Sequence, residues 1–298
     1  MEKGFRQRLA ERQERVGSLV CLGLDPLPEL MPAYIHKKYH HCRLGTKISL
    51  WMQHLVVAAA PYISLIKPQR AHYEALGHEG IRALENLNGY IRKYHPDIPI
   101  CDDCKRGDIG RTQERYRIAH FDHDGADAMN FSPYMGKDCM EYLADTEHPE
   151  HGIVGLCYTS NQSAREVQDV LLADGRQYWE FIAERTLAWA ESLGITENAG
   201  LVMAAAYEHP KGSGAVFSSH LTRCRQIVGD KLWFLIPGIG TQGGYIAETI
   251  RAAYAGYGSI AINSSSALIF ASSEPNYAEA CAHKAKVLRD SINQHLPV

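Results

Sequence analysis

The chain has 298 residues, of which 45% are hydrophobic and 22% are charged, and its formal net charge is -3. This balance is typical of a soluble globular protein with a large core, and it argues against long disordered stretches. Lysine and arginine are spread along the chain, which argues against a nucleic-acid partner, and no apolar run approaches the ~20 residues of a membrane span.

The first residues, 1–18, form a charged amphipathic pattern without the apolar segment of a signal peptide. We therefore expect an N-terminal helical extension and a cytoplasmic protein, whose eight cysteines are reduced and mostly buried. Cys101 and Cys104 form a C-x-x-C pair, but no second pair or histidine follows at zinc-finger spacing. We expect no metal or redox role for this pair.

Eight short runs rich in apolar and β-branched residues recur along the chain, and each ends at a polar or Gly/Pro signal before a helical pattern. Nearly continuous apolar strands are typical of a parallel sheet that is buried on both faces. We predict an α/β fold in which eight such units close into a single (β/α)8 TIM barrel over residues 1–298, with a doubly wound open sheet as the alternative. The predicted strands are 19–25, 62–68, 98–105, 128–133, 152–159, 200–205, 231–238 and 259–265.

The longest insertion, MPAYIHKKYHHCRLGTK, lies between the first predicted strand and its helix. It contains His36, His40 and His41, which could suggest a metal site. The cluster has no carboxylate partner, and we therefore predict a solvated loop.

The carboxyl ends of barrel strands face one shared mouth, where barrel enzymes hold their active sites. These ends carry Asp25, Lys67, Asp103 and Lys105. Because side chains alternate along a strand, Asp103 and Lys105 should point to the same face. A lysine held between two carboxylates stays protonated, so Lys105 could act as a positioned proton donor. Asp108 follows on the loop and could reach back over this site or outward to a neighbouring subunit.

The run PGIGTQGG at residues 237–244 contains four glycines and leads into a helix. Such a loop exposes backbone N–H groups at a helix N-terminus, which is a suitable phosphate site. Phosphate sites in barrels commonly use the loops after strands seven and eight, where this run and Asn263-Ser264-Ser265-Ser266 fall. The alternative is an ordinary flexible turn.

The motif Asp103-x-Lys105-x-x-Asp108, in the fuller form DCKRGDIGRT, resembles the signature of the orotidine 5′-phosphate decarboxylase family, in its longer bacterial-type branch. The blocks GLDPLPELMP, IKPQRAHYEALG, GADAMNFSPYMGKD, YTSNQSA and PGIGTQGG accompany it in order. The resemblance implies decarboxylation of orotidine 5′-monophosphate to UMP, the last step of de novo pyrimidine biosynthesis. It further implies that no metal or organic cofactor takes part and that the enzyme is a homodimer with composite sites.

The same resemblance implies roles for individual residues. Lys67, Asp103, Lys105 and Asp108 would form an alternating charged array, with Asp108 supplied across the dimer interface and Lys105 protonating C6 of the pyrimidine. Asp25 and Thr112 would hold the ribose hydroxyls, Ser160 the pyrimidine edge, and Gln242 with glycine amides the phosphate. The full set of implied substrate-binding residues is Asp25, Thr112, Ser160, Pro237, Gly240, Gln242, Gly243, Ser265 and Ser266.

The sequence departs from the family at three places. The family usually has an arginine that clamps the phosphate where this chain has Ser266, and a hydroxyl cannot replace that charged fork. Tyr158 stands where an arginine is usual, and the sixth strand reads VMAAAYE in place of a V-G-A-T-like run. These changes could repack the mouth, or a basic residue elsewhere, such as Arg70 or Arg106, could hold the phosphate.

Two alternatives follow. The D-x-K-x-x-D pattern is shared with magnesium-dependent sugar-phosphate lyases, although the second predicted strand ends in Lys67 as in the orotidine branch. The loss of the arginine at position 266 could instead mark a barrel that binds nucleotides without turnover. Against this, a cluster of mixed charge in a buried mouth costs stability unless function requires it.

Overall fold

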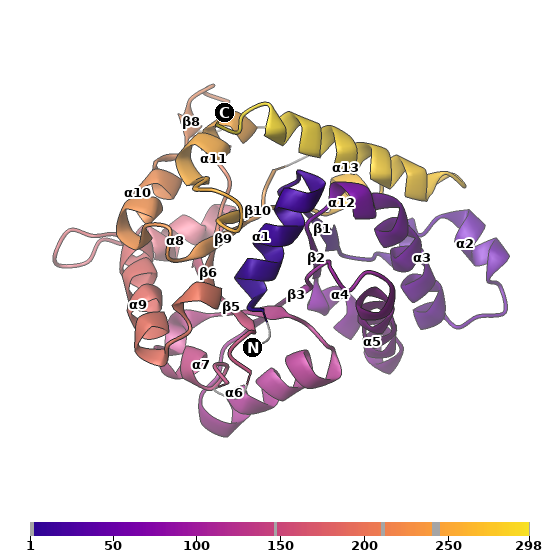
Figure 1. Cartoon of the computed structure of the whole chain (residues 1–298), viewed down its shortest axis with the longest axis horizontal. Coiled ribbons are helices and arrows are strands. Elements are labelled where there is room, and N and C mark those ends of the chain that lie inside the picture. The colour runs from indigo at the N-terminus through magenta and orange to yellow at the C-terminus, as the bar shows by residue number, and fades with distance from the viewer. Residues whose placement is uncertain (1–2, 146–147, 210–211, 240–244, 298) are drawn as a thin grey trace.

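The computed structural model describes residues 3–145, 148–209, 212–239 and 245–297. Eight parallel strands form a nearly closed barrel with helices around it (Figure 1). The strand order is β2-β1-β10-β9-β6-β5-β4-β3, and isolated parallel bridges from Ile66 to Ile100 and from Gln69 to Asp103 join the two edge strands. The barrel strands are β1 (Val20–Leu24), β2 (Leu65–Pro68), β3 (Cys101–Arg106), β4 (Ala128–Phe131), β5 (Gly152–Tyr158), β6 (Ala199–Met203), β9 (Trp233–Ile236) and β10 (Ile260–Ser264).

Each predicted strand overlaps one of these eight, so the predicted (β/α)8 barrel is confirmed. A small antiparallel hairpin of β7 (Tyr207–Glu208) and β8 (Val216–Phe217) follows β6 and was not predicted, because two-residue strands leave no periodic pattern. The described α-helices are α1 (Phe5–Val16), α2 (Ala33–Lys38), α3 (Leu44–Ala59), α4 (Arg70–Glu74), α5 (Gly77–Tyr94), α6 (Gly110–Arg117), α7 (Asp138–Glu141), α8 (Arg165–Gln168), α9 (Tyr178–Leu193), α10 (Ser219–Val228), α11 (Ile246–Ala253), α12 (Ser266–Ile269) and α13 (Tyr277–Asn293).

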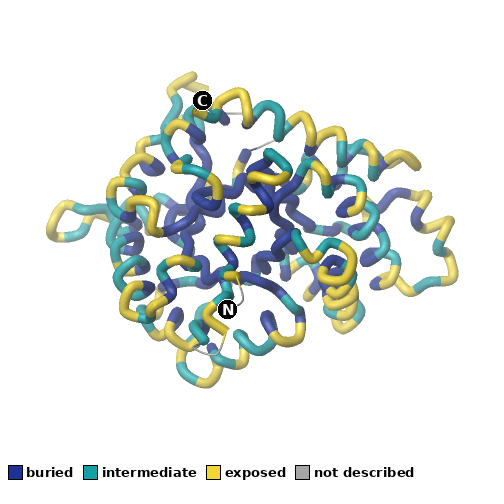
Figure 2. The backbone as a smooth tube through the Cα atoms, viewed as in Figure 1, coloured by how far each residue is buried: buried dark blue, intermediate teal, exposed yellow. Residues whose placement is uncertain are grey.

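Helix α1 covers the amino ends of the strands and crosses the centre of the view in Figure 1. Its Phe5 is fully buried, with its ring centroid 5.2 Å from that of Trp233. A Cβ atom at Gly200 would lie 2.5 Å from Trp233 Nε1, so glycine is needed for this close packing. The strands beneath α1 are almost entirely buried (Figure 2). A ligand must therefore enter from the opposite, carboxyl end.

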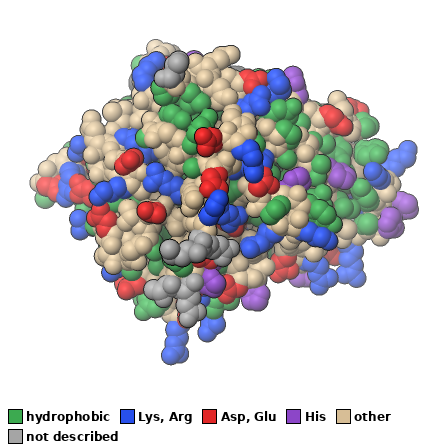
Figure 3. Space-filling view, in the orientation of Figure 1, with side chains coloured by type: hydrophobic (Ala, Val, Ile, Leu, Met, Phe, Trp, Pro, Cys, Tyr) green, Lys and Arg blue, Asp and Glu red, His purple; other side chains and the backbone are tan. Residues whose placement is uncertain are grey.

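Acidic and basic side chains are interspersed on the face that Figure 3 shows, around α1. Arg8 of α1, for example, pairs with Asp127 at 2.6 Å. This mixture differs from the basic stripe that nucleic-acid binding requires.

The remaining sequence expectations on local structure have mixed outcomes. All eight cysteines are free, and six of them are buried, as predicted. The histidine-rich insertion is partly wrong as a loop, because residues 33–38 form α2, but His36, His40 and His41 are all exposed. Within the described residues, no helix combines the length and the apolar composition that crossing a membrane requires.

Candidate active site

A cavity of about 560 Å³ lies at the carboxyl ends of the strands, within the size range of small-molecule sites. Six of the predicted site residues line it: Asp25, Lys67, Asp103, Lys105, Ser160 and Pro237. Gly240, Gln242 and Gly243 lie outside the described residues. Asp108, Thr112, Ser265 and Ser266 are described but do not line the cavity.

Lys67 and Asp103 form a buried ion pair at the base of the cavity. Lys67 Nζ lies 2.8 Å from Asp103 Oδ2 and 4.0 Å from Asp25 Oδ1, and the lysine side chain is only 4% exposed. Burial alone would lower the pKa of Lys67, but the carboxylates of Asp103 and Asp25 outweigh it and raise this pKa well above its usual range. The ammonium is therefore charged at neutral pH.

Asp103 is held on both of its carboxylate oxygens. Oδ2 also accepts a hydrogen bond from Gln69 Nε2 at 2.9 Å, and Oδ1 accepts one from Asn130 Nδ2 at 2.7 Å and pairs with Lys105 Nζ. Burial raises the pKa of Asp103, but Lys67 and Lys105 outweigh that effect and hold this pKa well below its usual range. The site thus contains a fixed carboxylate between two ammonium groups.

Lys105 reaches the cavity from an unusual backbone conformation. Its φ is 48°, in the left-handed region that few non-glycine residues adopt, and the β3–β4 pairing shifts register between Asp102 and Arg106. Asn130 Oδ1 accepts hydrogen bonds from the backbone N–H of Cys104 at 2.9 Å and of Lys105 at 2.7 Å. Lys105 and Asp103 face the same site, as predicted, but a side-chain amide rather than a regular ladder holds this part of β3.

Gln69 and Asn130 are therefore site residues that the sequence analysis missed. Both line the cavity and both donate to Asp103. Their signal was available, since each is a polar residue within or directly after an apolar strand run. Neither amide side chain is among the predicted site residues.

Two features of the cavity wall suit a hydroxylated ligand. Asp25 Oδ1 is buried without a hydrogen-bond donor, and a buried acceptor of this kind normally has a partner. Ser160 is exposed just after the end of β5 and lies against Gly238. A Cβ atom added to Gly238 would lie 3.5 Å from the Cβ atom of Ser160. The start of the glycine-rich run therefore borders the same wall.

Asp108 and Thr112 lie outside the cavity, beyond the end of β3. Asp108 Oδ1 accepts a hydrogen bond from the N–H of Ile109 at 2.8 Å, and its own N–H donates to Gln113 Oε1 at 3.1 Å. Thr112 is exposed on α6. Neither side chain reaches the cavity of its own chain.

The region after β10 offers hydroxyl groups but no cation. Ser265 Oγ packs against Gly23, and a Cβ atom added to Gly23 would lie 1.7 Å from this oxygen. Ser266 is exposed and is the first residue of α12. No arginine lines the cavity within the described part of the chain. Tyr158 is 2% exposed and hydrogen-bonds Tyr207 through their hydroxyl groups at 3.1 Å, so it packs behind the mouth.

The suggestion that Arg70 or Arg106 holds a phosphate is wrong. Arg70 pairs with Asp124 and lies 3.7 Å from Asp102, and Arg106 pairs with Glu74. Both guanidinium groups belong to a network on the face of β3 that points away from the cavity, buried around Arg70 and partly exposed where Arg106 meets Glu74.

Comparison with known proteins matches residues 18–281 to the family described as "Orotidine 5'-phosphate decarboxylase / HUMPS family". The orotidine 5'-phosphate decarboxylase of Ralstonia nicotianae is 40% identical over 98% of both chains, and that of Bordetella pertussis is 36% identical over 97% of this chain and 98% of the relative. Among solved structures, Leishmania donovani UMP synthase has a TM-score of 0.75 and 30% identity over 98% of this chain and 57% of that chain. A putative orotidine-monophosphate-decarboxylase from Toxoplasma gondii has a TM-score of 0.78 and 25% identity over 98% of both chains.

Proposed function

The chain belongs to the orotidine 5′-phosphate decarboxylase / HUMPS family, and from this premise we propose that it decarboxylates orotidine 5′-monophosphate to UMP. It is a carboxy-lyase of pyrimidine biosynthesis. The observation that carries the proposal is the array of Lys67, Asp103 and Lys105, which places a fixed carboxylate and a proton-bearing ammonium in one cavity.

The array accounts for each part of the reaction. When the bond between C6 and the carboxyl group breaks, carbon dioxide leaves and the electron pair stays on C6. The ammonium of Lys105 stabilises this charge without solvent reorganisation and then transfers a proton from Nζ to C6. The leaving group, the electron pair and the proton are thus all accounted for, and the step needs no metal or organic cofactor.

Asp103 adds repulsion that is relieved during the reaction. Lys67 and Lys105 keep the pKa of Asp103 low against the effect of burial, so this carboxylate cannot avoid a neighbouring substrate carboxylate by taking up a proton. The repulsion raises the energy of the bound substrate and disappears when carbon dioxide leaves. Binding energy from the ribose and the phosphate offsets this cost.

The remaining site residues are assigned to the substrate by their positions and by the family resemblance. Asp25 Oδ1, which lies 4.0 Å from Lys67 Nζ but has no hydrogen-bond donor, would accept a hydrogen bond from a ribose hydroxyl, and Ser160 would contact the pyrimidine edge beside Pro237. We assign the phosphate to the loops after β9 and β10, with Gly240, Gln242, Gly243, Ser265 and Ser266.

We also propose that the active enzyme is a homodimer with shared sites. Asp108 and Thr112 lie close together in sequence, and neither lines the cavity of its own chain. By the family resemblance, Asp108 would add a second carboxylate to the charged array and Thr112 a hydroxyl group that contacts the ribose. Each would enter the site of the partner subunit. The eight free cysteines favour the reducing cytoplasm as its location.

Metal dependence separates this function from the sugar-phosphate lyase alternative. We expect the EDTA-treated protein to convert orotidine 5′-monophosphate to UMP at the same rate as untreated protein, because Lys105 supplies both charge and proton. We expect no aldol cleavage of a 3-ketohexulose 6-phosphate, with or without added magnesium. Magnesium-dependent turnover of the sugar phosphate, with none of the nucleotide, would contradict the proposal.

Restoring the family arginine at position 266 should strengthen binding of the phosphate. A charge-assisted hydrogen bond contributes about 1.5–3 kcal/mol, so Ser266→Arg should lower the KM for orotidine 5′-monophosphate by about tenfold to a hundredfold. Turnover of orotidine, which lacks the phosphate, should not change.

Ser192→Arg is the matched control, because Ser192 is an exposed serine near the end of α9, on the side of the barrel away from the cavity. If both substitutions left the KM unchanged, or if Ser266→Arg affected orotidine equally, position 266 would have no part in holding the phosphate.

A further inference from the structure

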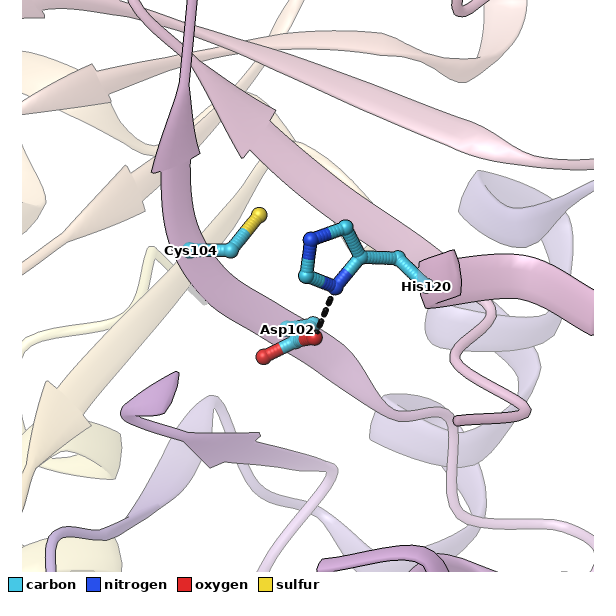
Figure 4. Close-up of side chains that lie close together, drawn as sticks. All are labelled: Asp102, Cys104 and His120. Atoms are coloured by element: carbon cyan, nitrogen blue, oxygen red, sulfur yellow. Dashed lines mark hydrogen bonds and ion pairs between the residues drawn. The ribbon is translucent and has the colours of Figure 1, made fainter. Parts of the chain in front are cut away.

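Behind the catalytic strand lies a buried cluster that the reaction described above does not use. Asp102 and Cys104 lie on the face of β3 opposite the cavity, and His120 packs against them from the π-helical segment Ile118–His123 that follows α6 (Figure 4). Arg106 of the same strand contacts the His120 ring. Asp102 and His120 are both fully buried. Buried polar groups of this kind persist where specific interactions stabilise them.

The hydrogen bonds of His120 define which nitrogen carries its proton. Nε2 lies 3.1 Å from Arg106 Nε, and a guanidinium can only donate, so Nε2 is the acceptor. Nδ1 lies 2.5 Å from Asp102 Oδ2 and 3.4 Å from Arg70 Nη1, and the much shorter contact with the carboxylate places the ring proton on Nδ1, which donates to Asp102. One ring therefore connects two residues of β3 that are four positions apart.

These two residues lie at either end of the irregular part of β3. Regular pairing with β4 is lost between Asp102 and Arg106, and the residues between them include Asp103 and the left-handed Lys105. A left-handed non-glycine residue costs about 1–3 kcal/mol and persists only where its surroundings enforce it. Asn130 holds the bulge from the cavity side, and His120 spans it from behind.

The cluster is in turn anchored to α4. Arg106 pairs with Glu74 at the end of that helix, and Arg70 at its start pairs with Asp124 and lies 3.7 Å from Asp102. Asp124 Oδ2 is itself 3.3 Å from His120 Nδ1. His120 thus lies at the centre of a network that ties β3 to the helix after β2.

A metal ion is the competing interpretation, because ligand atoms of Asp102, Cys104 and His120 lie within 4.8 Å of one another. Three observations disfavour it. The guanidinium of Arg106 occupies the free side of the imidazole, and Arg70 already compensates the carboxylates. The thiol of Cys104 is kept protonated, since burial and Asp102 raise its pKa, whereas metal binding requires the thiolate.

We infer that His120 is a positioning residue for Lys105: by bridging Asp102 and Arg106 it fixes the bulge that aims the Lys105 ammonium into the cavity. The inference rests on the proposed function, because it concerns the proton donor of that reaction. Its consequence is specific, since loss of the bridge misaims Lys105 without removing any group that contacts the ribose or phosphate.

The test compares His120→Leu with His120→Gln. Leucine fills the space without donor or acceptor, whereas glutamine keeps one of each and can connect Asp102 with Arg106. A misplacement of about 1 Å can cost about 10²-fold, so we expect His120→Leu to lower kcat for orotidine 5′-monophosphate by about that factor. UMP affinity should stay near that of the wild-type protein, and His120→Gln should recover most of the lost kcat.

His54→Leu is the control for removing a histidine that hydrogen-bonds within the fold. His54 Nδ1 lies 2.5 Å from the Tyr277 hydroxyl, between α3 and α13, and its Nε2 lies 3.5 Å from the Tyr39 hydroxyl, so both hydrogen-bond partners lie outside β3. This variant should keep its kcat. Arg106→Leu breaks the other arm of the bridge, and its effect should not add to that of His120→Leu, because both remove the same connection. If His120→Leu does not fold, Arg106→Leu with its own kcat and UMP affinity decides the question.

Failure of the proposed function and failure of the role of His120 give different results. A wild-type protein that does not turn over orotidine 5′-monophosphate would overturn the proposed function and this inference with it. An active wild type with an unchanged kcat in His120→Leu would overturn only the inference. Equal loss of kcat and UMP affinity, or a Zn²⁺-dependent rise in thermal stability that His120→Leu abolishes, would also overturn it.

Discussion

Replacing Lys105 with alanine should lower kcat for orotidine 5′-monophosphate by about 10²–10⁴-fold, the usual contribution of a positioned proton donor. The substitution should disturb the fold little, because the Lys105 side chain is 47% exposed and its removal leaves Asp103 paired with Lys67. Thermal stability and UMP affinity should therefore stay close to those of the wild-type protein. Steady-state kinetics and UMP titration by calorimetry measure both quantities.

Lys105→Arg is the matched control for charge. Arginine keeps a cation near C6, but its pKa above about 12 makes it a poor proton donor. We expect this variant to remain strongly impaired. If Lys105→Arg were as active as the wild type, Lys105 would act through its charge alone, and an unchanged kcat in Lys105→Ala would remove it from the mechanism.

Mixing two inactive variants should restore activity if the sites are shared between subunits. Lys105→Ala lacks the proton donor, and Asp108→Ala lacks the carboxylate that we assign to the neighbouring site. A dimer with one chain of each kind has one site with both groups intact and one site with neither. Random exchange between C2 dimers should thus recover roughly a quarter of the wild-type activity.

The control mixes Lys105→Ala with Lys105→Arg, in which no combination of chains rebuilds an intact site. Recovery only in the mixture that contains Asp108→Ala would support the composite site. If Asp108→Ala alone were fully active, or if the mixture stayed inactive although chain exchange was demonstrated, Asp108 would not be shared. Sedimentation of each variant establishes that the dimers form.

The barrel could be predicted because each strand is apolar over most of its length and ends at a polar signal. Lys67 and Asp103 could be placed in the mouth on the same grounds, since the carboxyl ends of parallel strands meet there. Arg106 was wrongly considered for the phosphate, although alternation places it on the same face as Asp102 and away from Asp103. Its partner Glu74 lies 32 residues earlier in the sequence.

The rest of the site depends on contacts between distant segments. The left-handed conformation of Lys105 interrupts the regular ladder on which the alternation argument depends. The groups that hold it, Asn130 and His120, come from the next strand and from the turn after α6. Asn130, a polar residue in an apolar strand, indicates a site residue but not that it holds the backbone of β3, and His120 has no local pattern that indicates its role.

Turnover of orotidine 5′-monophosphate by the purified, EDTA-treated chain tests the central claim most directly. The loss of orotate absorbance should match the formation of UMP and of carbon dioxide, one for one, and UMP binding should be measured on the same sample. We predict rapid conversion, even with Ser266 in place of the family arginine. UMP binding without conversion would contradict the account and would indicate a barrel that retains its nucleotide site but not its chemistry.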